Sequence, residues 1–215
     1  MWSAAQPLAP REARACGWRV IAPALQTPCA EQNSLLGDHA ERVAVLAAAI
    51  AKSLHRPEQE VARIRLAGRF HDLGKAAIPE AILDKPGPLD DTEWELVRHH
   101  PVVGERIASA SPDLKHTAPL IRSSHERIDG HGYPDQLTGQ DIPLGSRIIA
   151  VCDAYDAMTS DRVYRPAISI DAALQELERH ADTQFDATVV KAFCAAPELH
   201  RLPRRGATTA SIHPA

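Results

Sequence analysis

The chain has 215 residues, of which 44% are hydrophobic and 24% charged, and its formal net charge is −4. These values indicate one soluble domain with tails, and they give no reason to expect a nucleic-acid polymer as a partner. Apolar runs stay below the roughly 18 residues that a membrane span needs, and no positive start followed by an apolar block marks a secretion signal. The four cysteines lack CxxC spacing, which favours thiols in a reducing cytoplasm over a disulfide framework.

Both ends of the chain differ in composition from its middle. Residues 1–33 are rich in proline and alanine and have no stable period, so we expect a flexible leader or linker. Residues 197–215 are expected to form a disordered tail. The core at 34–196 shows no internal repeat, and it is predicted to fold as a single domain.

Helical periodicity dominates the first half of the core. One apolar face carries Leu36, Val43, Ala47, Ile50 and Leu54. A second face carries Val61, Ile64, Ala67 and Phe70, and Gly74 is well placed to stop that helix.

Later segments continue the helical pattern. Asp90 and Glu93 resemble a capping box, which opens a helix that runs to Ile107 and is bent by Pro101. Another helix is predicted through Leu120, Ile121 and His125. A loop rich in glycine and proline follows at 129–145, and helices are expected at 146–159, 170–181 and 187–195. The predicted fold class is all-α.

Imidazole and carboxylate groups recur within these apolar helical stretches. Burying such groups without a partner is costly, and a metal ion supplies a partner for several of them at once. The candidate metal ligands are His39, His71, Asp72, His100, His125 and Asp153. This mixture suits a first-row metal such as iron, manganese or zinc.

The individual signals differ in strength. His71 and Asp72 are adjacent near a helix end, where the carboxylate can bridge two metals while the imidazole binds one; a surface pair is the alternative. Of His99 and His100, the second shares a stripe with apolar residues and is expected to face inward, whereas His99 faces solvent. Asp156 lies on nearly the same helix face as Asp153, and we interpret it as a support for a ligand.

Cations and a glycine-rich loop lie close to these candidates in the sequence. Lys75, Arg162 and Arg165 are predicted to bind substrate phosphate, and surface charge is the alternative for each arginine. The loop HERIDGHGYP brings backbone close to a ligand at Gly132 and offers Tyr133 for stacking on a base. A plain structural turn with a packed tyrosine is the competing interpretation.

Together these segments resemble the HD-GYP domain, a branch of the HD phosphohydrolase superfamily. The resemblance covers roughly residues 34–196. The matching segments are HDLGK at 71–75, IPEAILDKPGPL at 78–89, HHPVVG at 99–104, HERIDGHGYP at 125–134, IPLGSRIIAVCDAYDAMTSDRVYR at 142–165 and FDATVVKAF at 185–193.

The resemblance implies an HD-domain helical bundle with a GYP loop and a role for each candidate residue. It implies that His39, His71, Asp72 and Asp153 bind one metal, that Asp72 bridges, and that His100 and His125 bind a second. Lys75, Arg162 and Arg165 would bind phosphate, and Gly132 with Tyr133 would meet a guanine. The expected cofactors are two divalent metal ions, iron or manganese, with Asp72 and Lys75 as the catalytic residues.

Two positions depart from the family pattern. Ser124 stands where the family usually has the first of two consecutive histidines, so the second metal is expected to bind more weakly. Leu35 stands where three-metal members use a glutamate, which favours two sites at most.

The leading hypothesis is a cytoplasmic metal-dependent phosphodiesterase that hydrolyses cyclic di-GMP to pGpG or GMP by attack of a metal-bridging hydroxide. The alternative is a degenerate signalling module that binds the dinucleotide or a protein partner without turnover, and an HD hydrolase for another phosphoester is a third reading. A separate regulatory protein is an expected partner if the domain stands alone, and apolar helix faces leave room for a homodimer.

Overall fold

The computed structural model describes residues 34–161 and 166–201. The chain divides into two units, Met1–Gly37 and Asp38–Ala215, and the contacts below belong to the second. No strand occurs in the described ranges, only two isolated bridges, which confirms the all-α prediction. The main helices are α2 (Ser34–Ser53), α3 (Glu58–Phe70), α5 (Asp91–Arg98), α6 (His100–Ala110), α7 (Ala118–Arg122), α8 (Leu144–Thr159), α9 (Ile170–Arg179) and α10 (Ala187–Cys194). Short turns add η1 (Leu73–Ala77), α4 (Glu80–Leu83), η2 (Gly139–Asp141) and η3 (Leu199–Arg201).

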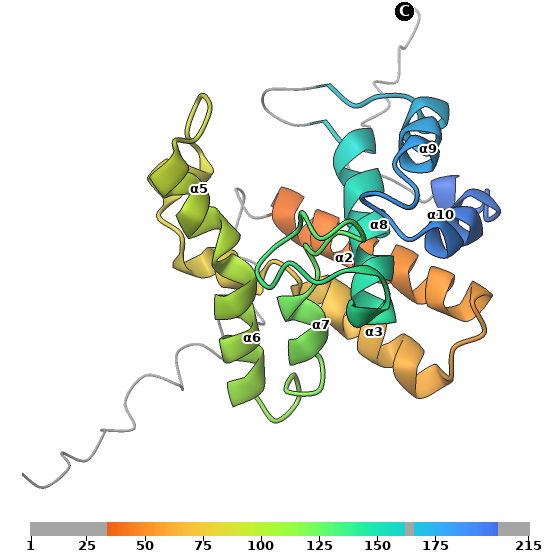
Figure 1. Cartoon of the computed structure of the whole chain (residues 1–215), viewed down its shortest axis with the longest axis horizontal. Coiled ribbons are helices and arrows are strands. Elements are labelled where there is room, and N and C mark those ends of the chain that lie inside the picture. The colour runs from red at the N-terminus through yellow and green to blue at the C-terminus, as the bar shows by residue number, and fades with distance from the viewer. Residues whose placement is uncertain (1–33, 162–165, 202–215) are drawn as a thin grey trace, which may run out of the picture. The chain divides into compact units, whose positions relative to one another are not determined.

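The hydrophobic core is built from the predicted apolar faces. Val43, Ala47 and Ile50 of α2 are fully buried, as is Ile64 of α3. Helix α8 contributes buried residues on several sides, and it packs against α3, α7, α9 and α10 (Figure 1). Burial of such side chains is the dominant favourable contribution to folding. No described helix is long and apolar enough to cross a bilayer.

The capping box is present, but the helix that it opens is shorter than predicted. The Asp90 side chain accepts from the Glu93 N–H while the Glu93 carboxylate accepts from the Asp90 N–H. Helix α5 then ends at Arg98, and α6 begins anew at His100. Pro101 lies in the first turn of α6, where its missing N–H costs nothing. The predicted bend is therefore a complete break between two helices.

Gly74 does not stop α3, contrary to the prediction. Helix α3 already ends at Phe70, and Gly74 lies inside η1 against the backbone of α6. A Cβ at this position would lie 1.9 Å from the carbonyl oxygen of His100. The missing side chain is what lets η1 and α6 touch, and this contact brings the His71–Asp72 pair beside His100.

Three predicted boundaries also shift. Helix α7 ends at Arg122, so His125 lies in the turn that follows and not on a helix. Helix α8 begins at Leu144, two residues before the predicted start. At the C-terminus, η3 with buried Leu199 and His200 continues the ordered domain to Arg201, because the His200 ring stacks on Phe193. The predicted leader at 1–33 and the rest of the predicted tail lie outside the described residues.

Candidate metal centre

The six predicted ligands converge on one place from distant parts of the chain. His39 comes from α2, His71 and Asp72 from the turn after α3, His100 from the start of α6, His125 from the turn after α7, and Asp153 from α8. Two groups have ligand atoms within 4.8 Å of one another, His39–His71–Asp72 and Asp72–His100–His125. Asp72 belongs to both groups. Asp153 adjoins the first group, with its Oδ1 3.2 Å from His39 Nε2 and 3.8 Å from His71 Nε2.

Hydrogen bonds fix the orientation of three of the imidazoles. The Nδ1–H of His71 donates to the Gly68 carbonyl at 2.8 Å, and that of His100 donates to the Val97 carbonyl at 2.7 Å. His39 donates from Nδ1 to the Asp156 carboxylate at 2.6 Å. When these rings are neutral, as metal binding requires, the other nitrogen, Nε2, carries a lone pair. Such an arrangement is typical of metal-binding histidines.

Two atoms at the centre fit a metal ion because they are electron-rich and lack hydrogen-bond partners. His71 Nε2 and Asp72 Oδ1 are buried, and among the described residues neither has a hydrogen-bond partner. His100 Nε2 lies 3.2 Å from Asp72 Oδ1 and 3.0 Å from His125 Nε2. Lone pairs this close repel unless a cation or a proton lies between them. The donor set of imidazole and carboxylate suits iron, manganese or zinc.

The electrostatics of the centre reflect this crowding. Burial alone would lower the pKa of His39, but hydrogen bonds to Asp153 and Asp156 outweigh it and raise the value to about 9. Burial lowers the pKa of His125 despite the nearby Asp72 carboxylate. Burial also opposes ionisation of Asp72, yet electrostatic interactions with His71 and Lys75 hold its pKa well below the usual range. The carboxylate is therefore anionic, as a bridging ligand must be.

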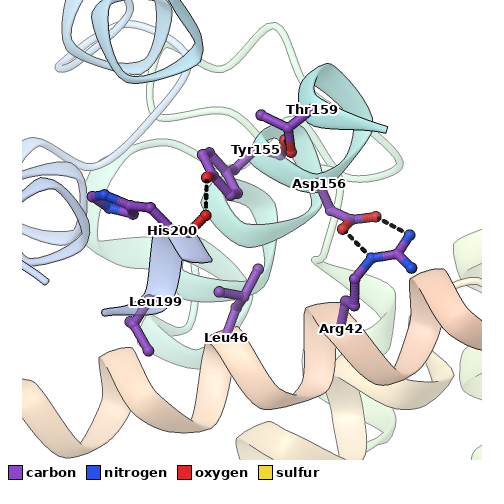
Figure 2. A pocket seen from close by; sticks show the side chains of 7 residues that line it. All are labelled: Arg42, Leu46, Tyr155, Asp156, Thr159, Leu199 and His200. Atoms are coloured by element: carbon purple, nitrogen blue, oxygen red, sulfur yellow. Dashed lines mark hydrogen bonds and ion pairs between the residues drawn. The ribbon is translucent and has the colours of Figure 1, made fainter. Parts of the chain in front are cut away.

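Asp156, predicted to support a ligand, accepts a hydrogen bond from His39, and it has a second partner that the sequence pattern did not indicate. Arg42 donates to both oxygens of Asp156, at 2.5 Å from Nε and 3.0 Å from Nη2, and Figure 2 shows this pair between α2 and α8. Arg42 also donates to the Ser160 hydroxyl at 3.3 Å. The spacing of Arg42 three residues after His39, on the same helix face, is the signal that identifies it.

Ser124 is buried beside the second group, and its hydroxyl is already engaged. Its Oγ–H donates to the Ile121 carbonyl at 2.8 Å, within the turn that ends α7. The second group therefore offers three ligand residues, Asp72, His100 and His125. The side chain of Leu35, the other departure, lies outside the described residues.

The GYP loop is tied to the centre through Tyr133. Its ring stacks on His125, with centroids 5.2 Å apart and an interplanar angle of 11°. Burial and the charges of Asp72 and Asp153 raise the pKa of the Tyr133 phenol, so this group stays neutral near pH 7. Gly132 is buried, and a Cβ there would lie 2.4 Å from the backbone nitrogen of Arg127. Close packing alone therefore requires glycine at this position, whether or not a ligand binds.

Glu126, which is not among the residues predicted from the sequence, anchors the same loop. Its buried carboxylate accepts from the N–H groups of Asp135, at 2.6 Å, and Leu137, at 3.1 Å. Both donors lie just beyond Tyr133, so these bonds fix the path of the loop past His125. The position of Glu126 directly after a candidate ligand is the signal that could have identified it.

The predicted phosphate-binding cations are only partly described. The Lys75 ammonium lies 2.6 Å from Asp72 Oδ2, at the edge of the centre. Arg162 and Arg165 fall outside the described residues. An open pocket of about 330 Å³ adjoins the GYP loop and the end of α5.

The fold and the centre define a helical protein with two candidate groups of metal ligands, histidines and aspartate, that share Asp72. A family model described as the HD domain matches residues 24–189. The chain belongs to the HD domain family, in its HD-GYP branch.

Curated relatives share this region of sequence. The cyclic di-GMP phosphodiesterase response regulator RpfG of Xanthomonas campestris is 41% identical over 154 residues, which cover 71% of this chain and 41% of that protein. The 3′3′-cGAMP-specific phosphodiesterase 3 of Vibrio cholerae is 40% identical over 148 residues, covering 69% of this chain and 32% of that protein. The chain thus spans less than half of either relative.

Solved structures support the fold. A cyclic GMP-AMP-specific phosphodiesterase of Vibrio cholerae aligns with a TM-score of 0.59 at 22% identity, over 74% of this chain and 44% of that one. An HDG"Y"P protein from Bdellovibrio bacteriovorus aligns with a TM-score of 0.60 at 17% identity, over 85% of this chain and 58% of that one.

Proposed function

We propose that the protein is a metal-dependent phosphodiesterase that hydrolyses a cyclic dinucleotide, cyclic di-GMP in the first place, to pGpG or GMP. The observation that carries the proposal is the pair of ligand groups that share Asp72. The relatives named for cyclic di-GMP and 3′3′-cGAMP hydrolysis support the substrate class.

The proposed ligands divide between two metal positions. His39, His71, Asp72 and Asp153 would hold one divalent ion, and Asp72, His100 and His125 a second, with iron or manganese as the proposed metals. When bound, two such ions activate water and neutralise the charge that develops on a phosphodiester. Asp156 and the backbone carbonyls of Gly68 and Val97 keep the imidazole lone pairs turned inward.

Lys75 is proposed to interact with the substrate phosphate. Its ammonium is held at the centre by Asp72 at 2.6 Å, so it lies where a nonbridging phosphate oxygen would approach. We propose the same role for Arg162 and Arg165 from their place in the sequence. Gly132 and Tyr133 would border the nucleoside.

The first test is turnover by the metal-loaded protein. We expect protein purified without oxygen and loaded with iron(II) or manganese(II) to convert cyclic di-GMP to pGpG or GMP, as followed by chromatography. Asp72→Ala should abolish hydrolysis and most metal content, because both groups lose their shared ligand. Retained hydrolysis in Asp72→Ala would refute the two-metal proposal.

A second candidate function rests on Ser124. Because residue 124 is serine, the second group lacks an imidazole at this position, and the serine hydroxyl already donates to the Ile121 carbonyl. A module that binds the dinucleotide without turnover is therefore the alternative. Ser124→His should raise the metal content towards two ions per chain and increase hydrolysis. Ser124→Ala is the matched control and should change neither, because the hydroxyl is already engaged with the Ile121 carbonyl.

The two candidates give opposite results. Measurable hydrolysis by the unaltered chain favours the enzyme. Binding of cyclic di-GMP without turnover, together with one metal per chain and activity gained in Ser124→His, favours the binding module.

A further inference from the structure

A pocket of about 330 Å³ opens beside the metal centre, between the end of α5 and the GYP loop. One side is formed by Glu95, Arg98 and His99, and the other by Gly132, Tyr133 and Gln136. Two links connect it to the centre: His99 immediately precedes His100, and the Tyr133 ring stacks on His125. Its volume falls in the range of roughly 300–1,000 Å³ that small-molecule sites occupy.

The lining combines an aromatic ring with polar groups of opposite kinds. Tyr133 offers a flat surface for stacking, Arg98 a fork of N–H donors, and Glu95 a carboxylate acceptor. Glu95 and Arg98 are three residues apart on α5 and therefore share a face. The Arg98 guanidinium lies 5.7 Å from the centroid of the Trp94 ring, which limits its freedom before any ligand binds.

The polarity of these groups matches one purine better than the other. Guanine presents acceptors at O6 and N7, which an arginine fork binds in a bidentate way, and it carries an N2 amine that a carboxylate can accept from. Adenine has an N6 amine in place of O6, so a donor on the protein would face a donor on the base. An unpaired polar group of this kind rejects the wrong ligand more strongly than a missing apolar contact does.

We propose that this pocket is a guanine-binding subsite in which Arg98 and Glu95 determine base specificity. The inference rests on the proposed function, because it assigns the base of the same dinucleotide. Arg98 binds O6 and N7, Glu95 accepts from the base amine, and Tyr133 lies along the base. Dinucleotides with at least one guanine are then ligands, and cyclic di-AMP is discriminated against.

Binding of cyclic di-GMP and cyclic di-AMP tests the subsite directly. Calorimetric titration of the full chain in the presence of a chelator separates binding from turnover. We expect the unaltered chain to prefer cyclic di-GMP by at least about fivefold, the smallest discrimination given by a bidentate pair. Arg98→Gln should reduce the preference below about twofold. Arg98→Lys should lose it too, since an ammonium keeps the charge but lacks the fork.

Arg63→Gln is the matched control, because Arg63 is an exposed arginine of α3 outside the pocket. It should retain the full preference. Equal affinities in the unaltered chain, undetectable binding of both ligands, or an unchanged preference in Arg98→Gln would overturn the inference.

A parallel assay of hydrolysis with added manganese(II) separates this inference from the proposed function. A guanine preference without turnover supports the subsite and refutes the enzyme. Turnover combined with a guanine preference that is the same in Arg98→Gln and in the unaltered chain supports the enzyme and refutes the subsite. If both hold, Arg98→Gln should raise KM for cyclic di-GMP with little change in kcat.

Discussion

Three histidines of the centre share one arrangement at the residue scale. Each donates a hydrogen bond from Nδ1 to a fixed oxygen, a backbone carbonyl for His71 and His100 and the Asp156 carboxylate for His39. Carbonyls within a helix turn cannot move independently, whereas a side-chain carboxylate needs its own support. Arg42 provides that support, so His39 depends on a chain of side chains where the other two depend on the backbone.

This difference predicts a specific sensitivity at Arg42. Arg42→Met should leave Asp156 free to rotate and weaken the first metal position by about 10–100-fold, the usual cost of losing a residue that supports a ligand. Metal affinity can be measured by competition with a chromogenic chelator. Asp156→Asn should give a loss of the same order, because it also disturbs the His39 tautomer.

Arg56→Met serves as the control for this series. Arg56 pairs with Glu60 on the exposed surface, where ion pairs contribute about 0–1 kcal/mol. It should leave metal affinity unchanged. Equal affinities in Arg42→Met and the unaltered chain would show that His39 is held by other contacts.

At the scale of elements, helix ends place the chemistry. His71 and Asp72 follow the end of α3, His100 opens α6, and His125 follows the end of α7. Such ends expose side chains toward a common point while the apolar helix bodies pack together. The contact between η1 and α6, which brings Asp72 beside His100, is so close that it leaves no room for a side chain at Gly74.

The local sequence pattern predicts the positions of these helices better than it predicts where they end. Apolar periodicity and the Asp90–Glu93 capping box are local signals, and the structure confirms both. The break at His99 and the end of α7 before His125 depend on packing between distant segments, which local periodicity does not record. The candidate ligands could be named from the sequence by their residue type. Arg42 and Glu126 had only a weak positional signal there, and their contacts show their roles.

Gly74→Ala tests the contact between η1 and α6. The added Cβ would overlap the His100 carbonyl, and it would also lie 2.7 Å from the Gly104 nitrogen, both of them backbone atoms that cannot rotate away. We expect the free energy of unfolding to fall by at least about 3 kcal/mol, measured by chemical denaturation. Metal content should fall as well, because His100 moves relative to Asp72.

Gly139→Ala provides the comparison. Gly139 has a φ of +50° and no atom within 4 Å of an added Cβ, so only the backbone conformation is penalised, by roughly 1–2 kcal/mol. Metal content should remain unchanged in this variant. Similar losses of stability in both variants would mean that η1 and α6 can move apart at little cost.

At the scale of the whole molecule, the centre links α2, the α3–η1 turn, α6, the turn after α7, and α8. A metal bound by these elements stabilises the folded chain, since the unfolded chain does not hold the ligands together. Without a metal the same lone pairs and carboxylates repel one another. The sign of the effect is therefore fixed: metal removal should lower stability.

The size of this effect follows from mass action. A ligand present at 100 times its dissociation constant stabilises a fold by about 2.7 kcal/mol. For a chain of this length that corresponds to a Tm decrease of roughly 5–10 °C when a chelator removes the metal. Differential scanning calorimetry of the manganese-loaded and chelated protein would measure it. Asp72→Asn should abolish the difference, because both groups lose their shared anionic ligand while the side-chain shape is kept. If the Tm of the unaltered chain is the same with and without the chelator, the helices and turns around the centre are held together by the apolar core alone.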